Sequence, residues 1–243
     1  MAKFGLIGRN IAYSFSKRFF SEKFERENLV HTYENFDISS IQKFQKILQE
    51  TPHLKGLNVT IPYKEEIIPF LDSLDADAEK IGAVNTIKIS EEGKLIGYNT
   101  DHFGFQKSLE AFLPLQQKTA LILGTGGASK AVAYALHKLG FEFKFVSRKK
   151  TTAGLLYSEM DKSTIENHPL IINCTPLGTF PNIADCPPLP YQFLTKNHLL
   201  FDLIYNPAET EFLKRGKMHG AQTTNGLKML ELQAEKAWEI WNS

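Results

Sequence analysis

Apolar and polar positions follow two different periods along the first part of the chain. Alternating apolar runs predict strands near residues 3–8, 31–36, 55–61 and 85–98. Helical spacing predicts helices near residues 17–28 and 39–50. The turn Glu91–Lys94 divides the last apolar stretch, so residues 86–98 are expected to form a hairpin. Strands that alternate with helices are typical of an α/β fold.

A second alternating series begins near Asp101. It predicts a helix to about Phe112, a strand at 119–123, a helix at 127–139, strands at 143–146, 170–173 and 199–203, and a final amphipathic helix at 227–241. No low-complexity linker separates the two series, so a short domain joint is expected at Asn99–His102. The proline-rich segment 180–190 is expected to be a loop.

Composition narrows the class of protein. The 243 residues are 42% hydrophobic, which is enough for two moderate domains. A net charge of +1 creates no strong field for nucleic acid or an anionic membrane, so a small molecule is the expected partner. Only Cys174 and Cys186 are present, which argues against a disulfide-stapled secreted domain and favours the cytoplasm. No signal peptide or membrane-spanning apolar run is expected.

The run from Asn58 to Lys64 combines a strand pattern with a lysine just past a proline. In an extended backbone Asn58 and Thr60 share one face, while Val59 and Ile61 point into a core. Pro62 suits the first turn of a helix, so a helix is expected to begin around Lys64. Lys64 would then lie beside the polar pair. Taken alone, however, such a lysine is expected to be a solvated surface residue, and only the rest of the chain favours a functional role.

A glycine-rich turn at 124–129 follows an apolar strand and precedes a helix, as a dinucleotide-binding fingerprint requires. Glycines allow close backbone approach, and the free amides of the helix start favour a pyrophosphate. The match is imperfect, because Ser129 occupies the third glycine position of G-x-G-x-x-G.

The next strand ends in Ser147-Arg148-Lys149, with no acidic residue to hold a ribose 2′-hydroxyl. Arginine can grip a phosphate through two hydrogen bonds, and lysine adds a point charge. The sequence therefore favours NADP over NAD. The alternative is that this basic run is only a solvated turn.

Three further polar groups are ambiguous when taken singly. Ser14 and Ser16 would share one face of an extended segment and could bind a carboxylate, although Ser16 could simply cap the following helix. Asn85-Thr86 and Asn99-Thr100-Asp101 form the other two groups. Thr100 or Asp101 could likewise be an ordinary helix cap.

Taken in order, these residues resemble the shikimate dehydrogenase family, the NADP-dependent reductases of 3-dehydroshikimate in aromatic amino acid biosynthesis. The resemblance runs almost end to end. Its matching pieces are Ser14–Ser16, Asn58–Lys64, Gly82–Thr86, Asn99–Asp101, Gly124–Ser129, Ser147-Arg148, Asn173–Gly178, Asp202–Tyr205, Gly226–Leu230 and Gln233.

The resemblance implies roles for individual residues. Lys64 and Asp101 would be catalytic, and both would also contact the substrate. The other expected substrate-binding residues are Ser14 and Ser16 at the carboxylate, Thr60, Asn85 and Gln233 at the ring hydroxyls, and Tyr205. The expected NADP-binding residues are Gly124, Thr125, Gly126, Gly127, Ala128, Ser147, Arg148, Lys149, Thr175, Leu203, Gly226 and Met229. Asn58 is expected to brace the loop around Lys64, and no metal is expected.

The family architecture implies an N-terminal α/β substrate domain and a Rossmann-like NADP-binding domain, with a cleft between them. The substrate domain would comprise 1–100 plus 226–243, and the NADP domain 101–225. The chain departs from the family at Asn10, Tyr13 and Lys17, where proline, histidine and proline are common. The segment 151–169 is also short, which would trim the adenine side of the NADP domain.

Ketone reduction needs a hydride on carbon and a proton on oxygen, and the nicotinamide supplies only the hydride. Lys64 could supply the proton, with Asp101 as its partner. The expected activity is reversible NADPH-dependent reduction of 3-dehydroshikimate to shikimate, on the route to chorismate. The alternatives are a quinate/shikimate dehydrogenase using NAD, or a non-catalytic NADP-binding regulatory module. A monomer or a homodimer is expected.

Overall fold

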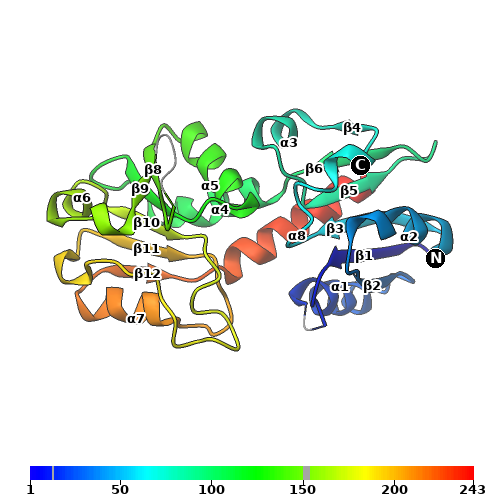
Figure 1. The fold of residues 1–243 in the computed structure, drawn as a ribbon. Coiled ribbons are helices and arrows are strands. Elements are labelled where there is room, and N and C mark those ends of the chain that lie inside the picture. Colours follow the sequence, from blue (N-terminus) through cyan, green and yellow to red (C-terminus); the bar gives the residue numbers. More distant parts are fainter. Residues whose placement is uncertain (13, 150–153) are drawn as a thin grey trace. The chain divides into compact units, whose positions relative to one another are not determined.

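The computed structural model describes residues 1–12, 14–149 and 154–243. They form two compact units (Figure 1). Unit 1 comprises Met1–Phe103 and Gln233–Ser243, and unit 2 comprises Gly104–Leu232. The chain passes from one unit to the other within helix α4 (Asp101–Leu109) and within helix α8 (Leu227–Asn242).

Unit 1 contains a mixed sheet. Its strands are ordered β2 (Thr32–Asp37), β1 (Lys3–Gly8), β3 (Leu54–Val59), β5 (Thr86–Ile89), β6 (Leu95–Tyr98) and β4 (Ser73–Leu74). β1 runs parallel to β2 and β3, whereas β5 pairs antiparallel with both β3 and β6. The β5–β6 hairpin confirms the prediction for residues 86–98.

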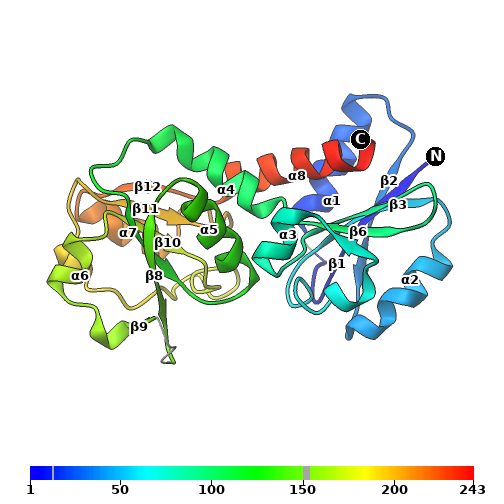
Figure 2. The same cartoon turned by 90° about the horizontal axis from the view of Figure 1, so that it is seen from above.

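Alternation along the strands buries both faces of this sheet. On one face, Phe4 and Leu6 pack with α1 (Phe15–Arg26) and the end of α8. On the other, Ile7 and Leu57 pack with the 3-10 turn η1 (Ile41–Lys43) and α2 (Phe44–Glu50). α1 and α2 accordingly lie on opposite sides of β1 (Figures 1 and 2).

Unit 2 contains a parallel sheet. Its strands are ordered β12 (Gln222–Thr224), β11 (Leu199–Asp202), β10 (Leu170–Asn173), β7 (Thr119–Leu123), β8 (Glu142–Ser147) and β9 (Leu155–Leu156). The chain starts at β7, moves outward through β8 and β9, and then returns to the other side of β7. This reversal is the doubly wound order of dinucleotide-binding folds, and ligands bind at the carboxyl edge where it occurs.

Helices cover both faces of the second sheet. α4 and α5 (Gly127–Lys138) pack on one face through Phe105, Val132 and Leu136. α6 (Lys162–Glu166) and α7 (Glu211–Met218) pack on the other through Ile165 and Phe212. The predicted α/β class and the Rossmann-like second part are both confirmed.

The predictions missed several short elements. They are β4, β9, β12, α3 (Ala76–Ile81), α6, α7 and the 3-10 turns η2 (Ile68–Phe70), η4 (Tyr157–Glu159) and η5 (Tyr191–Phe193). Elements this short carry too little periodicity to be read from a sequence. The 3-10 turn η3 (Glu110–Phe112) lies within the helix predicted to about Phe112.

The helix predicted to begin at Lys64 was wrong. Residues 61–67 form consecutive turns, and only η2 follows them. The strand also ends at Val59, two residues earlier than predicted, so Ile61 is 70% exposed and does not point into the core.

The connection from β8 to β9 is short. Residues 148–154 join these two parallel strands. Parallel crossovers normally take a dozen or more residues and a helix. Residues 150–153 of this connection lie outside the described residues, so the trimming of the adenine side expected from the short segment 151–169 stays a prediction.

Candidate active site

Lys64 and Asp101 form a largely buried ion pair in unit 1. Lys64 Nζ donates to Asp101 Oδ2 at 2.6 Å, and the two side chains are 16% and 8% exposed. Asn85 Nδ2 donates to the other carboxylate oxygen of Asp101 at 2.9 Å. Both oxygens of Asp101 therefore have a donor, which keeps the carboxylate satisfied away from water.

Asn85 lies at the centre of a buried polar cluster. Its Nδ2 also lies 2.9 Å from Thr100 Oγ1 and 3.2 Å from Gln233 Oε1. An amide nitrogen carries two hydrogens, so it cannot serve three acceptors fully at once. Asp101, Thr100 and Gln233 therefore share the two hydrogens of this nitrogen. The cluster brings together Asn85 directly before β5, Thr100 and Asp101 at the start of α4, and Gln233 of α8; their binding of a substrate stays a prediction.

The hydrogen-bonded cluster extends deeper into unit 1. Asn58 Nδ2 donates to Thr86 Oγ1 at 3.2 Å, and Tyr33 Oη donates to Asn58 Oδ1 at 2.7 Å. Thr86 Oγ1 donates in turn to Asn85 Oδ1 at 3.1 Å. Asn58 is only 4% exposed, so it does not form an accessible polar pair with Thr60. The link follows from register, because Asn58 and Thr86 are directly paired across β3 and β5.

Sequence reasoning missed Tyr33. Its partner Asn58 is 25 positions away, and an isolated tyrosine in a strand pattern normally indicates core packing. Burial raises the pKa of Tyr33 well above its usual range, and a hydrogen bond with Ser16 opposes that rise. The phenol is therefore a neutral donor.

Two helix caps decide alternatives that the sequence left open. Asn99 Oδ1 accepts from the backbone N–H groups of Asp101 and His102 at 3.1 and 3.4 Å. Asn99, rather than Thr100 or Asp101, thus caps α4, and the latter two side chains are available to the cluster.

Ser14, rather than Ser16, caps α1, since its Oγ accepts from Lys17 N at 3.2 Å. Ser16 lies inside that helix, so the expectation of an extended segment with two hydroxyls on one face was wrong. Ser14 also donates to Asn35 Oδ1 at 2.9 Å.

The loop before Ser14 is held by side chains of β2 instead of by prolines. Asn10 has a left-handed backbone (φ 59°), and its N–H donates to Asp37 Oδ1 at 3.0 Å. Ile11 N donates to the second oxygen of Asp37, and Asn35 Nδ2 donates to Ile11 O. Lys17 is exposed, and Tyr13 lies outside the described residues. These contacts hold the backbone of Asn10 and Ile11 against β2.

The glycine turn in unit 2 has the shape of a phosphate cradle. Gly124 follows β7 with φ 104°, a conformation that favours glycine, and a Cβ there would lie 3.2 Å from Thr175 Cγ2. At Gly126 a Cβ would meet nothing within 4 Å, so the space outside the turn is open. Thr125 and Gly126 are exposed, while Gly127 and Ala128 are half-buried in the first turn of α5. Ser129 Oγ donates to Gly126 O at 2.6 Å, so the third glycine is replaced without an unpaired hydroxyl.

The basic run lies at the same carboxyl edge of the sheet, one strand away. Ser147 ends β8, and its hydroxyl donates to the carbonyl of Lys149, which shapes the turn. Arg148 and Lys149 are exposed. Open amides beside exposed cations fit the pyrophosphate and 2′-phosphate of NADP.

A buried network orders the loops after β10 and β11. Asp202 accepts from Asn173 Nδ2 at 3.0 Å, from Ile204 N at 3.0 Å and from Thr210 Oγ1 at 2.5 Å. Asn173 Oδ1 in turn accepts from Thr175 Oγ1 at 2.7 Å. Burial raises the pKa of Asp202 to about 6, although these hydrogen bonds oppose the rise.

The remaining predicted residues of unit 2 lie near that network. Leu203 and Tyr205 follow β11 and are half-buried, and Met229 is buried in α8. Gly226 packs so closely on the backbone of Leu203 that a Cβ would lie 2.1 Å from Leu203 O. Thr60, in unit 1, is half-buried directly after β3.

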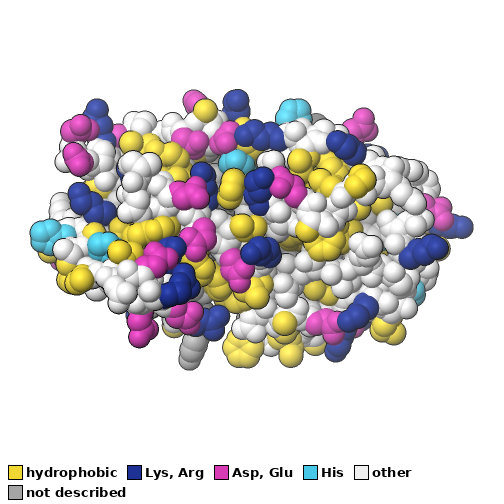
Figure 3. All heavy atoms as spheres, turned by 180° about the vertical axis from the view of Figure 1, so that it is seen from behind, with side chains coloured by type: hydrophobic (Ala, Val, Ile, Leu, Met, Phe, Trp, Pro, Cys, Tyr) yellow, Lys and Arg dark blue, Asp and Glu magenta, His cyan; other side chains and the backbone are white. Residues whose placement is uncertain are grey.

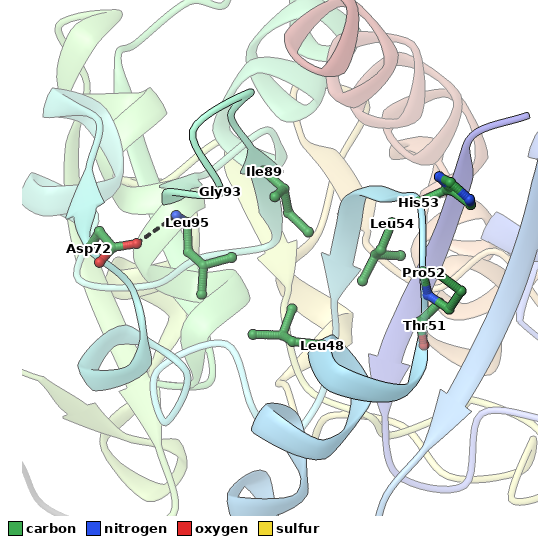
Figure 4. A pocket seen from close by; sticks show the side chains of 9 residues that line it. All are labelled: Leu48, Thr51, Pro52, His53, Leu54, Asp72, Ile89, Gly93 and Leu95. Carbon is green, nitrogen blue, oxygen red and sulfur yellow. Dashed lines mark hydrogen bonds between the residues drawn. The ribbon is translucent and has the colours of Figure 1, made fainter.

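The open cavity of unit 1 lies apart from these residues. It has a volume of about 370 Å³ and opens between the end of α2 and the β5–β6 hairpin (Figure 4). Its lining residues are Leu48, Thr51, Pro52, His53, Leu54, Asp72, Ile89, Gly93 and Leu95. None of the predicted site residues belongs to this lining, so the candidate site is argued from the hydrogen-bond geometry and not from this cavity.

Three further features of the described residues concern surface charge, metal ligands and membrane-spanning helices. Basic and acidic side chains are interspersed on the face seen in Figure 3. Within residues 1–12, 14–149 and 154–243, no group of three or more His, Cys, Asp or Glu side chains could hold a metal ion. The helices in these ranges include none with the length and apolarity needed to cross a membrane.

Comparisons with a family model and with curated proteins agree on one family. Residues 6–87 match the family model described as the shikimate dehydrogenase substrate binding domain. A protein named shikimate dehydrogenase (NADP(+)) from Clostridium botulinum is 39% identical, over 98% of this chain and 95% of its own length.

Two solved structures share the whole fold. Shikimate dehydrogenase 1 from Peptoclostridium difficile has a TM-score of 0.86 at 40% identity, covering 100% of this chain and 92% of that one. Shikimate 5-dehydrogenase from Thermus thermophilus, in complex with NADP(H) and shikimate, has a TM-score of 0.88 at 31% identity, covering 99% and 93%. The chain belongs to the shikimate dehydrogenase family.

Proposed function

We propose that this protein is an NADP-dependent shikimate dehydrogenase, which reversibly reduces 3-dehydroshikimate to shikimate on the route to chorismate and the aromatic amino acids. The observation that carries the proposal is the ion pair of Lys64 and Asp101, embedded in a cluster of hydroxyl-binding groups. Asn85 donates to Asp101 and also lies within hydrogen-bond distance of Gln233, so polar groups able to bind hydroxyls surround the ion pair.

Lys64 donates a proton to the reacting oxygen or accepts one from it, depending on the direction of the reaction. NADPH, when bound, supplies the hydride. In the direction of reduction, the ammonium of Lys64 stabilises negative charge that develops on the ketone oxygen and donates a proton to it. In the reverse direction its neutral amine accepts that proton. Asp101 holds Lys64 in place and balances its charge when it is protonated.

Substrate recognition follows from the same cluster. Asp101, Asn85, Gln233 and Thr60 bind the ring hydroxyls in this proposal, and Tyr205 contributes from unit 2. Ser14 and Ser16, at the start of α1, bind the carboxylate. The one hydroxyl proton of Ser14 is directed at Asn35, so Ser14 must turn away from Asn35 to donate to the substrate.

The cofactor is held by unit 2 in this proposal. Backbone amides of Gly124–Ala128 bind the pyrophosphate, while Ser147, Arg148 and Lys149 bind the 2′-phosphate. The nicotinamide side is lined by Thr175, Leu203, Gly226 and Met229. The enzyme acts in the cytoplasm as a monomer or a homodimer, and the unpaired thiols of Cys174 and Cys186 support a reducing compartment.

The test is an assay of the purified protein with 3-dehydroshikimate, following oxidation of NADPH and, separately, of NADH. The reverse reaction is then measured with shikimate and with quinate. We expect turnover with NADPH and shikimate to exceed the other combinations. Preference for NADH or quinate would assign a different specificity, and no oxidation with either cofactor would leave only a binding module.

A further inference from the structure

Lys23, in the middle of α1, is a buried cation outside the cluster described above. It is 6% exposed, and its Nζ donates to Glu27 at 2.9 Å and to Glu235 at 2.8 Å. Burial disfavours its charge, yet the bonds and charges of Glu235 and Glu27 outweigh burial and raise the pKa of Lys23. The two acids differ in position, because Glu27 caps α1 itself whereas Glu235 belongs to α8.

Glu235 lies two residues after Gln233, the member of the polar cluster that α8 contributes. Two residues correspond to about 200° around a helix of 3.6 residues per turn. The arc of α8 between Gln233 and Glu235 is apolar. It carries Ala234, Ala237 and Trp241, which are buried in the aromatic core of unit 1. Polar contacts therefore border the apolar stripe of α8 on both edges.

The apolar stripe alone does not define how α8 is rotated about its axis. Hydrophobic contact is non-directional, and aromatic rings can re-pack with little change in buried area. Charge-assisted hydrogen bonds are short and directional. The bond from Lys23 to Glu235 thus restrains rotation of α8 from one edge, while Gln233 meets Asn85 and Thr100 at the other.

We propose that Lys23 and Glu235 are positioning residues for substrate binding: their bond sets the rotation of α8 and so aims Gln233 into the polar cluster. The same bond ties α8 to α1, whose first turn carries Ser14 and Ser16. This inference rests on the proposed function, because Gln233 is taken to contact the substrate.

The closing experiment compares Glu235→Ala with Glu27→Ala, a matched control that removes the other acid from the same lysine. We expect Glu235→Ala to raise the KM for shikimate about three- to tenfold, with kcat and the Kd of NADPH within about twofold of the parent. Glu27→Ala should leave KM unchanged, and Lys23→Arg should retain most of the substrate affinity that Lys23→Met loses.

A second measurement does not depend on turnover. The side-chain amide resonance of Gln233 in the NMR spectrum should shift in Glu235→Ala and stay in place in Glu27→Ala. Equal effects of the two variants on KM, or an unmoved Gln233 resonance in Glu235→Ala, would overturn the proposal. An inactive parent protein would refute the proposed function instead, while the Gln233 resonance would still decide the positioning role.

Discussion

Lys64 Nζ donates a 2.6 Å hydrogen bond to Asp101 Oδ2, across 37 positions of sequence. If this lysine transfers the proton, Lys64→Ala should lower kcat by about 10²- to 10⁴-fold, the usual range for a general acid or base. The Kd of NADPH should not change, because the cofactor residues belong to unit 2. Steady-state kinetics and cofactor titration measure the two quantities. Lys55→Ala, an exposed lysine on β3, is the control, and turnover near that of the parent would refute the role of Lys64.

Asp101→Asn keeps the shape of the side chain but removes the charge that balances Lys64. We expect kcat to fall by at least about tenfold, since the amide cannot stabilise the ammonium as the carboxylate does. Steady-state kinetics measure kcat, and turnover equal to that of the parent would contradict the pairing as a functional one.

Arg148→Ala tests cofactor selection. Loss of charge-assisted hydrogen bonds to a phosphate should raise the Kd of NADPH about 10- to 100-fold and leave the Kd of NADH nearly unchanged. Fluorescence titration with each cofactor gives both values. Lys144→Ala, which removes an exposed cation from β8, controls for overall charge. An equal increase in the Kd of NADPH and of NADH would show that Arg148 does not bind the 2′-phosphate.

Tyr33→Phe should destabilise the protein by about 1 to 2 kcal/mol, because Asn58 Oδ1 would remain buried without its donor. Urea unfolding measures this difference. Tyr134→Phe, on α5, removes a hydroxyl from a half-buried tyrosine outside the network. An equal, small decrease in the free energy of unfolding of both variants would show that the bond between Tyr33 and Asn58 does not stabilise the protein.

Asp202 should make stability depend on pH. Burial raises its pKa from 3.8 to about 6, so the folded state holds the proton more tightly than the unfolded state. The resulting stabilisation is complete below the unfolded pKa and is lost as pH rises through about 6. From about pH 4 to pH 7, the free energy of unfolding of the parent should fall by about 2 to 3 kcal/mol relative to Asp202→Asn. Parallel pH curves for the two proteins would contradict the raised pKa.

Much of the fold was predictable because its signals are local. The strand at 119–123 and the glycine turn after it need only neighbouring residues to be recognised. The same is true of the hairpin at 86–98 and of the long final helix. By contrast, the helix expected at Lys64 failed because the segment 61–67 packs as turns against the core through Tyr63 and Ile67, and tertiary packing overrides a local preference.

The sequence by itself determined the α/β order, the phosphate-binding turn and the identities of the polar residues, because each depends on spacing along the chain. Only the tertiary structure decided which partner each polar side chain takes. It assigned the cap of α4 to Asn99 and left Asp101 to Lys64, and it buried Asn58 between Tyr33 and Thr86. The physical reason is that a buried hydrogen bond depends on distance and direction in space, and residues far apart in sequence meet only when sheet register and helix packing bring them together.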